Sequence, residues 1–397
     1  MLTRTSYRDI FLLAGCQALL LTNASGLITM NGLVGFSLAQ HKALATLGAT
    51  TYVLGSALST MPLSLWMARV GRRRGFMTAA VINIGGCALG ALAVWLASFA
   101  LYCTATAVIG IYNAAGLQYR FAAAEVATPF DKAKAISWVL AGGIAGGFVG
   151  PESVKLTRDL FATPFMGSFL MLAAYALVAL AVQSRVRVPR PVIEPDSGAG
   201  RPLAEIARQP VFIVAALAGA LGYGTMNLLM TATPIAMDMC SHPFSAAALV
   251  IEWHVVGMYA PGFFTGSLIK RFGVLKIIVA GAVVMAAGAL VALNGNTIAH
   301  FVGALILVGF GWNFLYTGGT TLLTESYRPV EKARTQGLND LIVFTTMAVS
   351  SLSSGALVST RGWEAMNAAA LPVIALIASA ALWLSRQRRA RAAGAVG

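Results

Sequence analysis

Residues 210–269 decide the fold, and they read PVFIVAALAGALGYGTMNLLMTATPIAMDMCSHPFSAAALVIEWHVVGMYAPGFFTGSLI. The short polar turn Cys240-Ser241-His242-Pro243 joins two apolar runs within this stretch. About 20 apolar residues in a helix cross the hydrocarbon core of a bilayer, and each run is at least that long. We therefore predict a helical hairpin that crosses a membrane twice, with spans near 210–237 and 244–269.

The whole chain has the composition of that hairpin. Its 397 residues are 58% hydrophobic and only 11% charged, with a mean hydropathy of +0.76. These values exclude an ordinary soluble domain and predict an all-α membrane protein with twelve transmembrane helices. The predicted spans lie near 9–31, 43–67, 76–97, 99–125, 133–155, 164–184, 210–237, 244–269, 274–293, 297–324, 335–358 and 364–384. The first span exceeds the apolar core of a signal peptide, so we expect it to remain in the protein.

The basic residues are distributed unevenly between the two predicted sides. Of the 28 Lys and Arg residues, 24 lie on the side that holds both chain ends, and only Lys42, Lys155, Arg158 and Arg361 lie on the other. Cytoplasmic loops of membrane proteins carry the excess of Lys and Arg, so both termini are predicted to be cytoplasmic. The net charge of +14 therefore reports orientation in a lipid bilayer, and we expect no nucleic-acid partner.

Echoes within the chain indicate a duplicated six-helix unit. The basic turn at 68–75 (ARVGRRRG) has a weaker copy at 269–273 (IKRFG). At a constant offset of 200, Glu125, Pro129, Asp131, Lys132, Ala133 and Lys134 recur as Glu325, Pro329, Glu331, Lys332, Ala333 and Arg334. We predict six-helix bundles over 1–184 and 210–397, joined by an Arg-rich and Pro-rich cytoplasmic linker at 185–209.

Two six-helix halves with a Gly-Arg-Arg turn between the second and third helices resemble the major facilitator superfamily over the whole chain. The match has one departure, because Ala68 stands where that family usually carries an aspartate. The resemblance implies a secondary transporter that binds its substrate between the halves and alternates access by rocking them. No Walker lysine, zinc-protease motif or nucleophile elbow occurs, so we expect no enzyme activity and no cofactor.

Soft metal donors are concentrated in the hairpin quoted above. Met226-xxx-Met230 and His254-xxx-Met258 are i, i+4 pairs, so each pair lies on one face of its helix. If the chain reverses near residue 242, Met230 is level with His254 and Met226 with Met258. Three thioethers and one imidazole suit Cu(I). The alternative is packing, since methionine is a common filler of helix interfaces.

The turn at the end of this hairpin carries further donors. Met237, Met239, Cys240 and His242 would lie on the outer side, directly above the two pairs. They could capture a metal ion and pass it inward, or form an ordinary turn that happens to be rich in methionine. Glu252, close to His254 but on another helix face, is either a proton-coupling group or a carboxyl in helix packing.

The two Met/His pairs in a facilitator of this length resemble the CcoA family of bacterial copper importers. The resemblance implies that Met226, Met230, His254 and Met258 ligate copper, transported as Cu(I) across the bacterial inner (cytoplasmic) membrane. Copper would then supply assembly of cbb3-type cytochrome oxidase, with copper chaperones as further partners.

Other functions remain open. Relatives in the wider family without these motifs resemble riboflavin transporters, in which the methionines would line a cavity for an organic solute. Gly146-xxx-Gly150-Pro151 resembles a motif of drug/proton antiporters. A non-transporting copper sensor is disfavoured, because the chain shows no soluble signalling domain.

Overall fold

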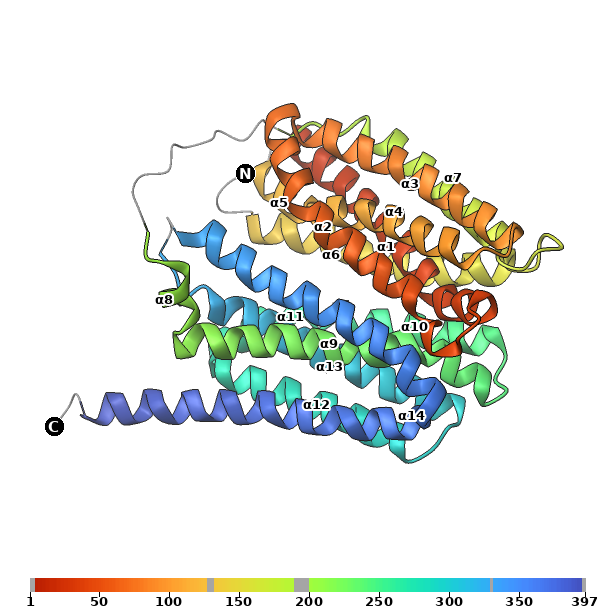
Figure 1. Cartoon of the computed structure of the whole chain (residues 1–397). Helices are drawn as coiled ribbons and strands as arrows, with labels where there is room; N and C mark the ends of the chain where they lie inside the picture. The colour runs from red at the N-terminus through yellow and green to blue at the C-terminus, as the bar shows by residue number, and fades with distance from the viewer. Residues whose placement is uncertain (1–3, 127–131, 189–199, 329–330, 395–397) are drawn as a thin grey trace.

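A computed structural model describes residues 4–126, 132–188, 200–328 and 331–394 (Figure 1). The first half of the chain folds into α1 (Arg4–Leu38), the short helix η1 (Lys42–Leu44), α2 (Leu47–Val70), α3 (Arg72–Trp95), α4 (Phe99–Gly116), α5 (Tyr119–Val126), α6 (Lys132–Thr157) and α7 (Met166–Gln183). The second half folds into α8 (Leu203–Ala207), α9 (Pro210–Met239), α10 (Phe244–Tyr259), α11 (Gly262–Phe272), α12 (Val274–Leu293), α13 (Ile298–Leu323) and α14 (Lys332–Gly394).

The number of spans agrees with the prediction. Within the described ranges, nine helical stretches are long and apolar enough to cross a membrane. The last of them, 334–391, is long enough for two spans and is broken at Gly362, whose φ of 80° and ψ of 175° are not helical. With α2 and α6, these stretches correspond to the twelve predicted segments, so the all-α architecture is confirmed.

Two glycines give the basic turns of both halves the same conformation. Gly71 separates α2 from α3 with φ 91° and ψ 153°, and Gly273 separates α11 from α12 with φ 90° and ψ 147°. Side chains with a Cβ rarely adopt such positive φ values. Each glycine donates its N–H to the helix before it, to Met67 O and to Ile269 O respectively. The sequence echo therefore reflects one local structure built twice.

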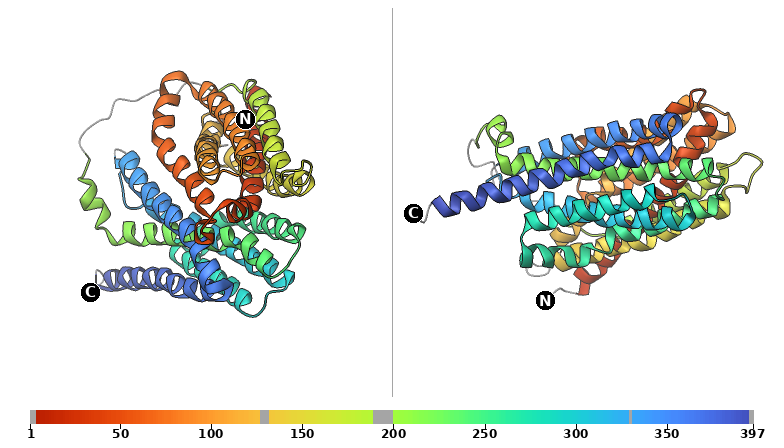
Figure 2. Two further views of the ribbon diagram at one scale, coloured as in Figure 1. Left: turned by 45° about the vertical axis from the view of Figure 1, so that its right-hand side comes forward. Right: turned by 90° about the horizontal axis from the view of Figure 1, so that it is seen from below.

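Helix packing repeats between the halves in the same way. In the first half α1 packs along α6, and α4 packs along α2 and α3. In the second half the equivalent contacts join α9 to α14, and α13 to α10 and α12. The chain is thus two six-helix halves related by pseudo-symmetry, which appear as separate groups of helices in two views (Figures 1 and 2).

The halves are joined by hydrogen bonds at the end of the bundle that contains η1, which we call the η1 end. Thr46 donates its Oγ1 hydrogen to Ser351 O at 2.6 Å and accepts from Gly355 N at 3.0 Å. α6 packs against α10, with the rings of Phe148 and Trp253 6.2 Å apart. α8 and the C-terminus lie at the opposite end (Figure 1).

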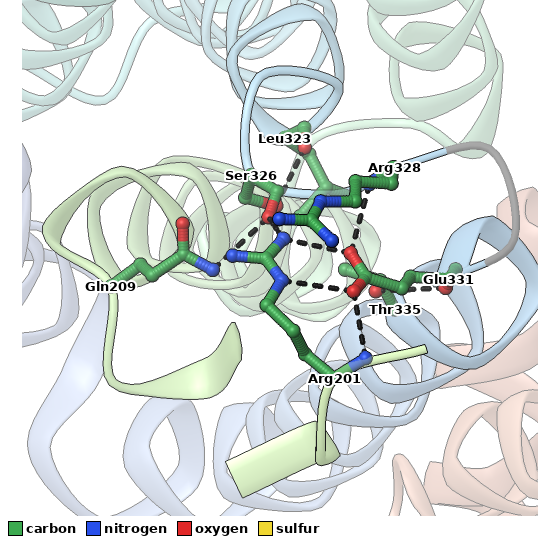
Figure 3. A network of polar contacts seen from close by, with 7 residues as sticks. All are labelled: Arg201, Gln209, Leu323, Ser326, Arg328, Glu331 and Thr335. Carbon is green, nitrogen blue, oxygen red and sulfur yellow. Dashed lines mark hydrogen bonds and ion pairs between the residues drawn. The ribbon is translucent and has the colours of Figure 1, made fainter. Parts of the chain in front are cut away.

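A network of polar contacts attaches the end of the linker to the second half (Figure 3). Arg201 donates to the Glu331 carboxylate from Nε at 2.9 Å and from Nη2 at 2.7 Å, and its backbone N–H donates at 2.8 Å. Ser326 O accepts from both Arg201 and Gln209 at 3.1 Å. Only 1% of the Glu331 side chain is exposed. The Arg201 guanidinium holds the pKa of Glu331 well below the usual range of a glutamate.

The residues of the second sequence echo do not all make equivalent contacts. Glu125 forms an ion pair with Arg72 at 2.8 Å, within the first half. Its counterpart Glu325 instead pairs with Arg388, near the end of α14, at 2.6 Å. Three other members of the echo, Pro129, Asp131 and Pro329, lie outside the described residues. Similar sequence at these two places therefore supports different ion pairs.

Candidate functional site

The eighth span is interrupted close to its middle. α10 ends at Tyr259 and α11 begins at Gly262, because Pro261 has no N–H to continue the helical hydrogen bonds. Asn313 on α13 compensates by donating from Nδ2 to Met258 O at 2.7 Å. Thr265 in turn donates to Asn313 Oδ1 at 2.7 Å. A side chain of α13 therefore holds the interrupted helix in place.

Two glycines allow α10 and α13 to cross with their backbones in contact. A Cβ added at Gly257 would lie 2.6 Å from Ile306 O, and one added at Gly309 would lie 2.7 Å from His254 O. Both distances are shorter than real Cβ contacts, so neither position accepts a side chain without movement. This crossing brings the end of α10 against the middle of α13.

Four aromatic residues meet beside this crossing, and we call them the aromatic cluster: Tyr223 on α9, Tyr259 on α10, and Trp312 and Tyr316 on α13. The Trp312 and Tyr316 rings are stacked, with centroids 5.3 Å apart and planes 10° apart. Tyr223 lies edge-on to both, at 5.1 Å and 5.3 Å, and Tyr259 lies 6.3 Å from Trp312. Trp312 is only 6% exposed, and its Nε1 donor has no hydrogen-bond partner among the residues that the structure describes.

The aromatic cluster borders the junction between the halves. Tyr223 packs against a small apolar group that includes Ala220 and Val343 from the second half and Val53 from the first. Tyr52 of α2 packs against the same group. Major helices of both halves therefore meet at the level where the aromatic rings gather, near the middle of α9 and α13.

These aromatic residues were not predicted from the sequence. They come from three separate helices, and no linear motif connects Tyr223 or Tyr259 to the others. Trp312-xxx-Tyr316 is the one local signal, because an i, i+4 aromatic pair shares one helix face. Apart from that pair, only the packing of α9 and α10 against α13 brings the rings together.

The predicted thioether ligands lie in the apolar core. Met226 and Met237 are fully buried, and Met230 and Met258 are each 6% exposed. All four belong to the main hydrophobic cluster. α10 packs chiefly against α13, whereas α9 packs chiefly against α14 and next against α13, and both helices contact each other much less. The prediction that Met230 lies level with His254 considered α9 and α10 alone and did not include α13, which packs against both.

The structure gives His254 a role in joining two helices. The side chain is fully buried, and its Nδ1 lies 2.6 Å from Leu305 O on α13. A carbonyl oxygen can only accept a hydrogen bond, so Nδ1 carries the proton and donates it. Nε2 has no hydrogen-bond partner in the ranges that the structure describes. The imidazole therefore fastens α10 to α13 beside the glycine crossing.

The donors predicted in the turn between α9 and α10 differ in their exposure and in their contacts. Met239 is 54% exposed, Cys240 is half-buried, and the His242 Nε2 lies 2.6 Å from Asn296 O in the loop between α12 and α13. The His242 ring also contacts Phe301 edge-on. In the part of the chain that the structure describes, no three His, Cys, Asp or Glu side chains are grouped so that they could hold a metal ion.

The chain matches the model of the Major Facilitator Superfamily over residues 10–252 and 221–396. It is 42% identical over 373 residues to the riboflavin transporter RfnT of Brucella anthropi, covering 93% of this chain and 94% of that protein. It is 30% identical over 361 residues to the uncharacterised MFS-type transporter YdeG of Bacillus subtilis, covering 86% and 83%.

Solved structures show the same fold at low sequence identity. A bacterial homolog of the human lysosomal transporter Spinster, inward-facing and unoccupied, superposes with a TM-score of 0.73 at 16% identity, over 97% of this chain and 98% of that one. The POT family transporter PepTSo gives a TM-score of 0.72 at 13% identity, over 96% and 98%. At these identities the likeness concerns the fold alone.

The prediction of copper import is wrong. The curated relative that matches along nearly its whole length is named a riboflavin transporter, which contradicts copper as the substrate. Without copper import, the predicted supply of copper to cbb3-type cytochrome oxidase has no support, and neither has the narrower resemblance to the CcoA family. The i, i+4 spacing of the Met/His pairs is equally compatible with the buried packing in which these side chains are found.

Proposed function

Because the chain belongs to the major facilitator superfamily, we propose that it is a secondary transporter that carries riboflavin across a membrane by alternating access. The observation that carries this proposal is the 42% identity to the riboflavin transporter RfnT along 93% of the chain. The interrupted eighth span supports it as well, since transporters of this kind build their substrate sites from discontinuous helices near the midplane.

The aromatic cluster has the chemistry that a flavin requires. The isoalloxazine ring of riboflavin is flat, largely apolar and bordered by carbonyl acceptors. Flat rings bind to proteins by stacking on aromatic side chains, and each such contact contributes about 1–3 kcal/mol. Tyr223, Tyr259, Trp312 and Tyr316 provide rings in parallel and edge-on orientations around one point. We propose that this cluster contacts the flavin ring.

Trp312 also provides a polar contact. A buried donor without a partner loses about 1–3 kcal/mol of hydrogen bonding, and Trp312 Nε1 is such a donor. A carbonyl oxygen of the flavin would satisfy it. The contact would orient the ring in a region that otherwise offers mostly apolar surface.

We also propose the arrangement of the chain in the membrane. Both termini and the 185–209 linker between the bundles 1–184 and 210–397 are cytoplasmic, as the distribution of Lys and Arg supports. The η1 end then faces outward, because it lies opposite α8 (Figure 1). The membrane is the bacterial inner membrane.

Uptake into cells tests the proposed substrate. A bacterial strain that can neither synthesise nor import riboflavin should grow at low external riboflavin when it produces this chain. Radiolabelled riboflavin should accumulate in the same cells, and unlabelled riboflavin should compete. An expressed, membrane-inserted chain that gives neither growth nor accumulation would show that riboflavin is not the substrate.

A further inference from the structure

Glu252 is a buried carboxyl group in a membrane-spanning helix. It lies in the third turn of α10, and only 4% of the residue is exposed. Within the described part of the chain, its Oε1 atom has no hydrogen-bond partner. A charged carboxylate in such a place is costly unless it is paired, and ionisable groups inside spans are by default functional.

Glu252 lies where the two halves meet. α10 crosses α6 so closely that a Cβ added at Gly147 would lie 2.5 Å from the Val255 side chain. Phe148 and Trp253 contact edge-on beside this crossing. The two helices run in opposite directions, so the next turn of α6 towards the η1 end brings Glu152 to the level of Glu252.

The carboxyl of Glu152 therefore faces that of Glu252 from the other half. Lys155, one turn further along α6, donates to both carboxylate oxygens of Glu152, at 3.1 Å and 3.3 Å. The Glu152 and Lys155 side chains are 46% and 40% exposed, so this pair reaches water. The buried Glu252 side chain does not reach water in this structure.

Arg158, just after α6, places its guanidinium 4.9 Å from the Phe244 ring at the start of α10, about two turns from Glu252. Among the described side chains of the helices that contact α10, the other charged or titratable groups lie near helix ends: Asp238 at the end of α9, His300 at the start of α13, Arg8 and Asp9 at the start of α1, and Lys270 and Arg271 at the end of α11. His254 on α10 itself is already bonded to Leu305 O. Glu152 and Lys155 are the charged groups that act on Glu252.

Closing the η1 end brings the buried carboxyl group of Glu252 against the carboxyl group of Glu152 from the opposite half. Two adjacent carboxylates cannot both stay ionised, and one of them takes up a proton. Lys155 compensates the charge of Glu152, which leaves Glu252 as the group that must be neutral. When the halves separate at this end, Glu252 returns to water and can ionise again.

We propose that Glu252 is a proton-binding site that links closure of the η1 end to the uptake of one proton. A proton from the outer water binds a carboxylate oxygen of Glu252 as the halves close, and it returns to that water when they reopen. The proposal rests on the alternating access proposed above, but it does not depend on which solute the chain carries.

Distances between spin labels across the η1 end test this site. Labels are placed at Leu160→Cys in the first half and Arg361→Cys in the second, both exposed, with Cys103 and Cys240 replaced by Ser. Pulsed electron paramagnetic resonance then measures the full-length protein in lipid between pH 5 and pH 9. We expect the short distance of the closed state to dominate at low pH and to decline as pH rises.

Variants identify the group that titrates. Glu252→Gln is a neutral isostere and should keep the short distance at every pH, whereas the exposed control Glu364→Gln should follow the wild type. Lys155→Met leaves Glu152 uncompensated, so the midpoint should move to higher pH by about one unit. A merely structural role for Glu252 would not produce that shift.

Two results would overturn the proton site: distances in the wild-type protein that do not change with pH, or a Glu252→Gln variant that retains the wild-type profile. Failure of riboflavin uptake is a separate result. If riboflavin is not transported but the distances respond to pH as described, the proposed substrate is wrong and the proton site stands.

Discussion

Replacing Trp312 tests whether the aromatic cluster binds the flavin ring. Trp312→Ala removes the ring that stacks on Tyr316 at 5.3 Å and also removes the unpaired Nε1 donor. Loss of one stacking contact costs about 1–3 kcal/mol. Since 1.4 kcal/mol corresponds to a tenfold change, the dissociation constant for riboflavin should rise about 5- to 140-fold. Isothermal titration of the purified protein with riboflavin measures it.

A second variant separates the two contributions of Trp312. Trp312→Phe keeps an aromatic ring but has no donor, so it should lose about 1 kcal/mol, or about fivefold in affinity. It also leaves a smaller cavity than alanine. The matched control is Trp383→Ala on α14, because that side chain is 51% exposed and outside the cluster. Unchanged riboflavin affinity in a folded Trp312→Ala protein would refute the assignment of the cluster as the binding site.

Three further predictions concern stability and orientation. Glu331→Gln should lower the thermal midpoint at pH 7, and Glu205→Gln, on exposed α8, should not. Because Arg201 lowers the pKa of Glu331, the ionised Glu331 contributes its full stabilisation of the fold above about pH 5, and this stabilisation declines as pH falls below the ordinary glutamate pKa of about 4.3. A difference in thermal midpoint between wild type and Glu331→Gln that grew in acid would contradict this. Gly309→Ala should cost about 1–3 kcal/mol of unfolding free energy through overpacking, whereas Gly85→Ala, with open space around it, should cost nothing; equal thermal midpoints would argue against the tight crossing. Reporter fusions at both termini should be active only in the cytoplasm, and activity outside would reverse the topology.

The spans could be predicted from the sequence because hydropathy is a local property. Each predicted segment contains enough apolar residues to cross a bilayer, and a helix satisfies its own backbone hydrogen bonds there. The glycine turns at Gly71 and Gly273 were recognisable as repeats for a similar reason, since each conformation depends on a few consecutive residues. Orientation stays a prediction, because it rests on the distribution of Lys and Arg alone.

The candidate site could be predicted only in part. Residues 210–269 were singled out from the sequence for their methionines and histidines, and the same stretch contributes Tyr223, Tyr259 and the buried Glu252. The prediction failed on the substrate, because the i, i+4 spacing of Met226 with Met230 and of His254 with Met258 does not distinguish metal ligands from core packing. His254 was predicted to lie level with Met230, but helical spacing could not show that its Nδ1 donates to Leu305 O on α13.

The sequence by itself therefore determined the number of spans, the duplication of the six-helix unit and the positions of its turns. Only the tertiary structure decided which side chains meet between the spans. α13 packs against both α9 and α10, and Trp312 lies more than 50 residues from Tyr259 along the chain. Hydropathy and helical spacing describe one helix at a time, whereas a site between helices depends on which helices are neighbours and how closely glycines such as Gly257 and Gly309 let them approach.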